Sequence, residues 1–137
     1  MSAVLVDAGP LIALIDRADR DHGRCVAALK RISGRLLTTW MPVTEAMHLL
    51  ASSQEGQGAL LEMIEREALQ VLPIDATDLP PIRHLMRKYA DLPMDFADAT
   101  LVHVAVRERL RDIFTLDRRD FGAYRLGPRK GFNIVPV

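Results

Sequence analysis

The sequence predicts an α/β fold: a three-layer α/β/α domain with a mostly parallel sheet of four or five strands. Short apolar runs alternate with helix-like segments along the whole chain, which is the pattern of βαβ units. The chain has 137 residues, of which 49% are hydrophobic, and this is enough for one core. Because neither a repeat nor a linker is visible, we expect a single domain over residues 1–137, with right-handed crossovers.

The first half of the chain is predicted to contain three strands separated by helices. The strands are AVLV (3–6), LLTTW (36–40) and LQVLPI (69–74), and the helices cover about 10–17, 21–32, 42–53 and a last stretch ending near 67. Pro10 and Pro42 suit the first turn of their helices, where a proline loses no hydrogen bond. We expect Gly56 and Gly58 to break the helical segment between the last two of these helices.

The second half is predicted to contain two helices and two further strands. The apolar residues of its first helix recur at the spacing of one helical face: Ile82, Leu85, Met86 and Tyr89. Pro80 and Pro81 fall in the first turn of this helix, which should stop before Leu92 and Pro93. A long helix is expected over 96–111, and strands are expected at DIFTL (112–116) and FNIVPV (132–137).

Composition and motifs exclude several classes of protein. Eighteen basic and eighteen acidic residues give a formal net charge of zero, so overall charge does not indicate a nucleic-acid binder. The single cysteine, Cys25, excludes an intrachain disulfide and a cysteine-rich zinc site, and it fits a reducing, cytoplasmic setting. We see no secretory signal and no apolar run of membrane-spanning length, and we therefore expect no membrane partner. The phosphate-binding patterns GxxxxGK[ST] and GxGxxG are absent.

Four acidic residues fall where the predicted strands end or where the next helix begins. Asp7 directly follows the first predicted strand, and Glu45 lies in the first turn of the helix after the second strand. Asp98 lies in the first turn of the helix that leads to the fourth strand, and Asp117 directly follows the fourth strand. In an open parallel sheet, ligands bind beyond the carboxyl ends of the strands. We therefore expect these four acids to lie together at one edge of the sheet.

Each acid also has a structural explanation, but the four together point to a cation. Asp98 follows Asp95 by three residues, as in a helix cap, and Glu45 and Asp117 suit a helix start and a turn. No lysine or arginine lies within two residues of Asp7, Glu45 or Asp98. Carboxylate oxygens suit Mg²⁺ or Mn²⁺, and such ions activate water and polarise phosphoryl oxygens. The pattern therefore indicates metal-assisted hydrolysis of a phosphodiester.

Basic and aromatic residues give weaker indications. Arg118 and Arg119 flank Asp117 at the expected metal edge, where a nucleic-acid backbone would pass, and arginine can grip phosphate bidentately. Trp40, at the end of the second predicted strand, is expected to belong to the core rather than to stack on a base. The four histidines are scattered, and we expect them to be structural or on the surface.

At these acids the chain resembles PIN-domain ribonucleases, most of all the VapC-type toxins of bacterial toxin–antitoxin pairs. The matching stretches are VDAGPLIALIDRADRDH (6–22), PVTEAMHLL (42–50), MDFADATLVHVA (94–105) and FTLDRRDF (114–121). The resemblance implies a metal site of Asp7, Glu45, Asp98 and Asp117, with Asp95, Thr115 and Asp120 as accessory residues. Ala8 and Gly9 depart from the family, which often has a hydroxyl residue near the first aspartate.

The resemblance also implies a function, a cofactor and partners. We expect a Mg²⁺- or Mn²⁺-dependent endoribonuclease that acts as a toxin, forms a homodimer and is inhibited by a cognate antitoxin covering its cleft. Asp7, Asp98 and Asp117 would hold metal, and Glu45 would be a ligand or the base for the attacking water. Two alternatives stay open: a PIN nuclease that processes RNA outside toxin biology, and a catalytically silent PIN-like module that binds other proteins.

Overall fold

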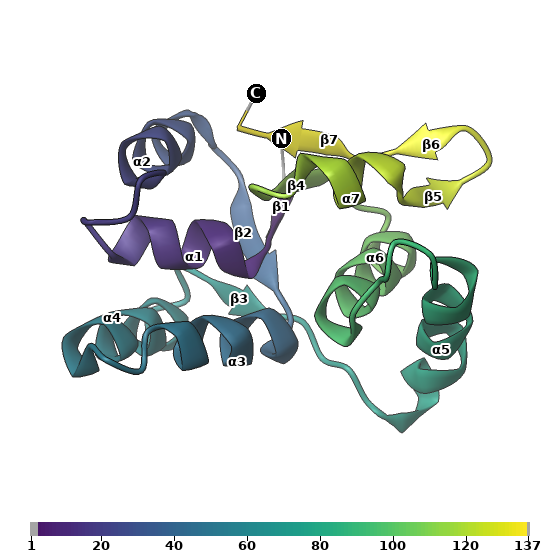
Figure 1. The fold of residues 1–137 in the computed structure, drawn as a ribbon, viewed down its shortest axis with the longest axis horizontal. Coiled ribbons are helices and arrows are strands. Elements are labelled where there is room, and N and C mark those ends of the chain that lie inside the picture. The colour runs from purple at the N-terminus through teal and green to yellow at the C-terminus, as the bar shows by residue number, and fades with distance from the viewer. Residues whose placement is uncertain (1–2, 137) are drawn as a thin grey trace.

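The computed structural model describes residues 3–136 and shows a five-stranded parallel sheet between two layers of helices (Figure 1). The sheet strands are β1 (Ala3–Val6), β2 (Arg35–Thr38), β3 (Gln70–Val71), β4 (Asp112–Phe114) and β7 (Asn133–Val135). Their order is β3-β2-β1-β4-β7, and every neighbouring pair is parallel. The predicted fold class is confirmed.

The helices and a small hairpin complete the domain. The α-helices are α1 (Ala8–Ile15), α2 (His22–Arg31), α3 (Trp40–Leu49), α4 (Gln54–Glu65), α5 (Leu79–Lys88), α6 (Phe96–Glu108) and α7 (Arg118–Ala123). A 3₁₀ turn, η1 (Ala76–Asp78), precedes α5, and β5 (Arg125–Gly127) pairs antiparallel with β6 (Lys130–Gly131). Within residues 3–136, none of the helices combines the length and the apolar composition needed to cross a membrane.

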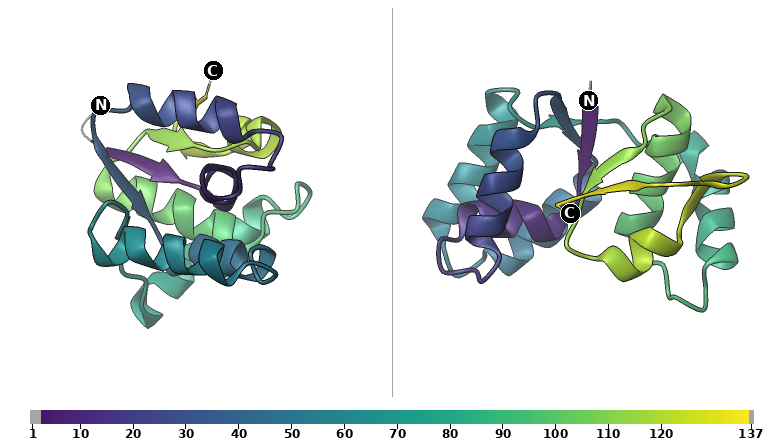
Figure 2. Two further views of the ribbon diagram at one scale, coloured as in Figure 1. Left: turned by 90° about the vertical axis from the view of Figure 1, so that its left-hand side faces the viewer. Right: turned by 90° about the horizontal axis from the view of Figure 1, so that it is seen from above.

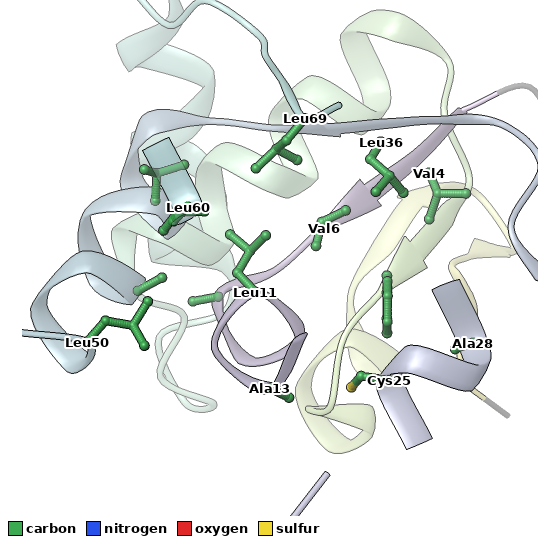
Figure 3. Close-up of a cluster of buried hydrophobic side chains, with 14 residues drawn as sticks. Val4, Val6, Leu11, Ala13, Cys25, Ala28, Leu36, Leu50, Leu60 and Leu69 are labelled. Atoms are coloured by element: carbon green, nitrogen blue, oxygen red, sulfur yellow. The ribbon is translucent and has the colours of Figure 1, made fainter. Parts of the chain in front are cut away.

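Alternation along the central strand divides the core into two halves. Val4 and Val6 face the layer made by α1 to α4, whereas Ala3 and Leu5 face the layer made by α5, α6 and α7. The first half of the core, around Leu11, is drawn in Figure 3, and Figure 2 shows the sheet lying between the two helical layers. Because β1 is buried on both faces, its sequence is apolar at every position.

The break between α3 and α4 is not where the glycines predicted it. Gly56 and Gly58 lie inside α4, and the chain turns before them, over residues 50–53. Ser53 caps α4, since its Oγ accepts a hydrogen bond from the Gly56 N–H at 2.9 Å. A Cβ at position 56 would lie 3.0 Å from Ser53 Oγ and 3.4 Å from Ile15 Cγ2. Gly56 therefore serves close packing against the cap and α1 rather than helix termination.

Other sequence predictions need smaller corrections. The α6 helix ends at Glu108 rather than at residue 111, because Arg109 takes a left-handed backbone conformation with φ of 57°. Trp40 is the first residue of α3 and is 51% exposed, so the prediction that it belongs to the core is wrong. The third predicted strand pairs over two residues only, and Val137, predicted to end the last strand, lies outside the described residues.

The strand order creates a crevice at the carboxyl ends of β1 and β4. The chain runs outward from β1 to β2 and β3, then returns to place β4 on the other side of β1. Connections on the two sides of this switch point leave in opposite directions, and α/β proteins bind ligands there. Asp7 follows β1, and Asp117 comes three residues after β4, so both stand at this crevice.

Candidate functional site

An acidic cleft of about 460 Å³ lies at the switch point of the sheet. Its lining comprises Asp7, Gly9, Glu45, Pro93, Asp95, Asp98, Leu116, Asp117 and Asp120. Six of these residues are carboxylic acids, and within residues 3–136 no lysine or arginine lines the cleft. The structure therefore brings together all four acids that the sequence placed at this edge, along with two of the three accessory residues.

Asp7 is held rigidly at the end of β1. Its Oδ1 accepts a hydrogen bond from the Ala8 N–H at 2.8 Å, which caps α1, and its Oδ2 accepts one from Thr115 Oγ1 at 2.8 Å. Thr115 is fully buried, and its Oγ1 in turn accepts from the Asp117 N–H at 3.0 Å. The predicted accessory hydroxyl thus connects the acid after β1 to the acid after β4.

Asp98 enters the cleft from the first turn of α6. The Asp95 side chain caps this helix by accepting from the Asp98 N–H at 2.8 Å, as its spacing in the sequence suggested. The Asp98 carboxylate is not used in capping, and its Oδ2 accepts a hydrogen bond from the Tyr124 hydroxyl at 2.8 Å. Cap and cleft carboxylate are therefore two separate residues of one helix start.

Three carboxylates form the tightest group in the cleft. One oxygen from each of Asp98, Asp117 and Asp120 lies within 4.8 Å of the others. Asp117 caps α7 by accepting from the Asp120 N–H at 3.0 Å, and this turn brings the two acids side by side. Asp120, predicted only as an accessory acid, belongs to this group. Asp7 and Glu45 line the same cleft but lie outside the trio.

The electrostatics of the cleft reflect carboxylates gathered without cations. Burial, with added repulsion from Asp7, Asp95 and Asp117, raises the pKa of Asp98 to about 8. Burial also raises the pKa of Asp7 to about 6, against the hydrogen bond from Thr115. The pKa values of Glu45 and Asp120 are raised as well, first by burial and then by neighbouring acids. The charged forms of these groups are therefore costly unless a cation joins them.

The donor set fits a hard divalent cation. Clustered carboxylate oxygens are the ligands that Mg²⁺ and Mn²⁺ prefer, and two or three carboxylates plus water complete a coordination shell for such ions. Asp98, Asp117 and Asp120 offer such oxygens from two helices, with Asp7 and Glu45 on the same cleft wall. The acidic cluster of the described residues is therefore consistent with a divalent metal.

The two arginines beside Asp117 differ in their surroundings. Both are exposed at the start of α7. Arg118 Nη1 donates to the Pro136 carbonyl at 2.9 Å, which ties α7 to the C-terminal strand. The positive charge of Arg119 acts on Asp120 and partly offsets the rise in the pKa of that acid. Arg119 is therefore close enough to a cleft acid for its charge to act on it, whereas the guanidinium of Arg118 is engaged by the C-terminal strand.

Tyr124 is the site residue that sequence reasoning missed. Its residue is fully buried, and its hydroxyl reaches Asp98 from the end of α7. The only available signal was its position seven residues after Asp117, which matters only if 117–124 is helical. The sequence predicts no helix over that segment, because six residues are too few to show a helical period, and Tyr124 therefore does not stand out as a neighbour of the acids.

Comparison with known proteins shows which family the chain matches. A family model described as PIN domain matches residues 4–126. The chain is 28% identical over 135 residues, 97% of its length, to the whole of a protein named Ribonuclease VapC26 from Mycobacterium tuberculosis.

Two solved structures share the fold. One is VapC20 of Mycobacterium tuberculosis, described as a sarcin-ricin loop cleaving toxin, with a TM-score of 0.80 at 15% identity over 90% of this chain and 98% of that one. The other is a toxin–antitoxin complex from Klebsiella pneumoniae, with a TM-score of 0.66 at 18% identity over 90% and 93% of the two chains.

The raised pKa of Asp98 gives a prediction about stability. Since the pKa rises from 3.8 to about 8 on folding, the folded protein binds more protons than the unfolded chain between these values, and stability falls as the pH rises through this window. Asp98→Asn removes the charge and keeps an acceptor for Tyr124. In EDTA at pH 9 it should raise the free energy of unfolding by about 1 kcal/mol after solvent screening, and the gain should vanish near pH 4.

Urea denaturation at the two pH values measures this difference. Asp91→Asn, at an exposed aspartate outside the cleft lining, is the matched control and should leave stability unchanged at both. An Asp98→Asn protein less stable than wild type at pH 9 would mean that the carboxylate serves the start of α6, where a negative charge is favourable.

Proposed function

Because this chain belongs to the PIN-domain family, as the resemblance in its sequence predicted, we propose that it is a metal-dependent endoribonuclease and the toxin of a toxin–antitoxin pair. The observation that carries the proposal is the cleft of six acids without a lining cation at the switch point of the sheet. A relative that is 28% identical over 97% of this chain is named a ribonuclease, which supports the proposed activity. We take residues 1–137 as one domain with this activity.

Within the cleft, we assign the acids distinct roles. Asp98, Asp117 and Asp120 would hold a Mg²⁺ or Mn²⁺ ion together with Asp7, and the bound ion would polarise a phosphoryl oxygen and acidify a water molecule. Glu45 lies on the open wall of the cleft. Partial desolvation of its carboxyl, and then repulsion from Asp95, raise the pKa of this group, which suits a base that takes the proton from the attacking water. Thr115 keeps Asp7 oriented.

The substrate class follows from the geometry and the family. An open acidic cleft binds a polyanion only through cations, either metal ions within it or basic side chains on its rim. Arg119, exposed beside Asp120, would contact an RNA phosphate close to the trio. We assign Arg118 a smaller part in RNA binding, because its guanidinium already donates to Pro136.

The partners are a cognate antitoxin and a second copy of the chain. A structural neighbour is itself a toxin–antitoxin complex, and an acidic cleft can be closed by a protein segment that brings a basic side chain. The homodimer rests on the family resemblance. The apolar residues of α4 serve mainly the core: Leu60 is fully buried, Met63 and Ile64 pack on the core, and Leu61 is exposed.

RNA cleavage tests the proposed activity. The purified chain should cleave total RNA in Mg²⁺ or Mn²⁺ and not in EDTA, and the cut ends can be mapped by sequencing. Glu45→Gln should slow cleavage by about 100-fold or more, since it removes the proposed base and keeps the shape of the side chain. Glu65→Gln, at an exposed glutamate at the end of α4, is the control and should cleave at the wild-type rate.

The toxin assignment has a separate outcome. Induced expression of the chain in bacteria should arrest growth, and Glu45→Gln should not. A chain that cleaves RNA without arresting growth would indicate an RNA-processing nuclease, and a chain that neither binds Mn²⁺ nor cleaves RNA would indicate a silent binding module.

The salt dependence of RNA binding tests Arg119. In the Glu45→Gln background, Arg119→Ala should reduce the slope of log Kd against log salt concentration by about one phosphate contact, measured by fluorescence anisotropy with a single-stranded oligonucleotide. Arg118→Ala should change the slope less. Arg31→Ala, at the exposed end of α2, is the control. A slope that Arg119→Ala leaves unchanged removes this residue from the RNA path.

The homodimer is tested by light scattering. We expect the mass of two chains at micromolar concentration, because the family resemblance implies a stable dimer. A single-chain mass over that range would show that the free protein is a monomer.

A further inference from the structure

Helix α7 presents three polar side chains to the carboxylate of Asp98 from one face. Asp117, Asp120 and Tyr124 are spaced i, i+3 and i+7, from the residue before the helix to the residue after it. Asp117 and Asp120 supply two members of the carboxylate trio, and Tyr124 donates to the third. In Figure 1 this short helix lies next to α6, and both helices pack into the same half of the core.

The position of the Tyr124 hydroxyl is fixed by aromatic packing. The ring meets Tyr89 and Phe121 edge to face, with 5.1 Å between ring centroids in each pair, and Phe121 meets Phe132 in the same way at 5.6 Å. The residue is fully buried, so its hydroxyl needs a partner, and its partner is Asp98 Oδ2. Packing in the core therefore fixes the ring, and with it the position of the hydroxyl at the cleft.

The hydrogen bond constrains a carboxylate that has few other contacts. Among residues 3–136, the only side-chain hydrogen bond of Asp98 is the one that Oδ2 accepts from Tyr124, and Oδ1 has no donor. A carboxylate that accepts one fixed hydrogen bond loses rotational freedom while its second oxygen stays available. Tyr124 thus selects the orientation in which Asp98 faces Asp117 and Asp120.

We propose that Tyr124 is a positioning residue of the metal site, whose hydroxyl holds Asp98 by Oδ2 in the orientation that completes a divalent-cation site with Asp117 and Asp120. This inference rests on the proposed function, because it takes the three acids as metal ligands. Partners that hydrogen-bond a ligating carboxylate commonly change metal affinity by 10–100-fold when they are removed.

Titration calorimetry with Mn²⁺ alone, in the absence of RNA, tests the inference. Tyr124→Phe keeps the ring and its packing and removes only the hydroxyl, and we expect Mn²⁺ to bind about tenfold more weakly. Tyr89→Phe is a matched control in the same aromatic cluster. Its hydroxyl accepts a hydrogen bond from the Arg125 N–H and, among residues 3–136, forms no hydrogen bond with an acid, so Mn²⁺ affinity should be that of wild type.

Thermal unfolding of both variants without metal completes the experiment. A tyrosine with a purely structural role would lower the melting temperature and leave Mn²⁺ affinity of the folded protein unchanged, and this result for Tyr124→Phe would overturn the inference. Equal losses of affinity in both variants would also overturn it, because the aromatic cluster rather than the hydroxyl would be responsible. If wild type binds no Mn²⁺, the proposed function fails and the inference fails with it; if wild type binds and Tyr124→Phe binds equally well, only the inference fails.

Discussion

The constraint that organises this molecule is the gathering of carboxylates in a cleft that no lysine or arginine of the described residues lines. Like charges a few ångströms apart repel, and burial raises the cost of ionisation further. Apart from the charge of Arg119 near Asp120, the fold offsets part of this cost with backbone N–H groups at helix starts. Asp7, Asp95 and Asp117 each cap a helix, so the N-termini of α1, α6 and α7 all point N–H groups at the cleft. A parallel α/β sheet provides these helix starts, because each helix begins near the carboxyl edge of the sheet.

This arrangement removes the apparent choice between capping and function for the cleft acids. A cap acid uses one carboxylate oxygen for the backbone, as Asp117 does with Oδ1, and keeps the rest of its acceptor capacity. At the start of α6 the two tasks fall to different residues, Asp95 for the cap and Asp98 for the cleft. In such a sequence the same acidic residues can indicate both a helix start and a functional site. Neither helix capping nor a role in the cleft is then a complete explanation of a single acid.

The sequence predicted what depends on strand ends and missed what depends on side-chain packing. Apolar runs located β1, β2 and β4 closely, and with them the acids that follow. The α7 helix was not predicted, because six residues are too few to show a helical period. Without this helix, neither the contact of Tyr124 with Asp98 nor the place of Asp120 in the carboxylate trio could be predicted. Gly56 was misread because its tight contact with Ser53 exists only after folding. Trp40 was placed in the core on residue type alone, whereas its position at the start of α3 exposes it.

The hydrogen bonds also rank the acids by how freely each can serve a cation. An ionised carboxylate has about four acceptor sites. Asp7 commits two of them, one on each oxygen, to Ala8 and Thr115, so any metal contact it makes must share an oxygen with a fixed donor. Asp98 commits one, to Tyr124, and leaves a whole oxygen without a donor from residues 3–136. Asp98 is also the acid whose pKa is raised most, to about 8 against about 6 for Asp7, so it has the most to gain from a cation. The carboxylate with a free oxygen is thus also the one whose charge most needs a cation, and it is the carboxylate to which the Tyr124 hydroxyl donates.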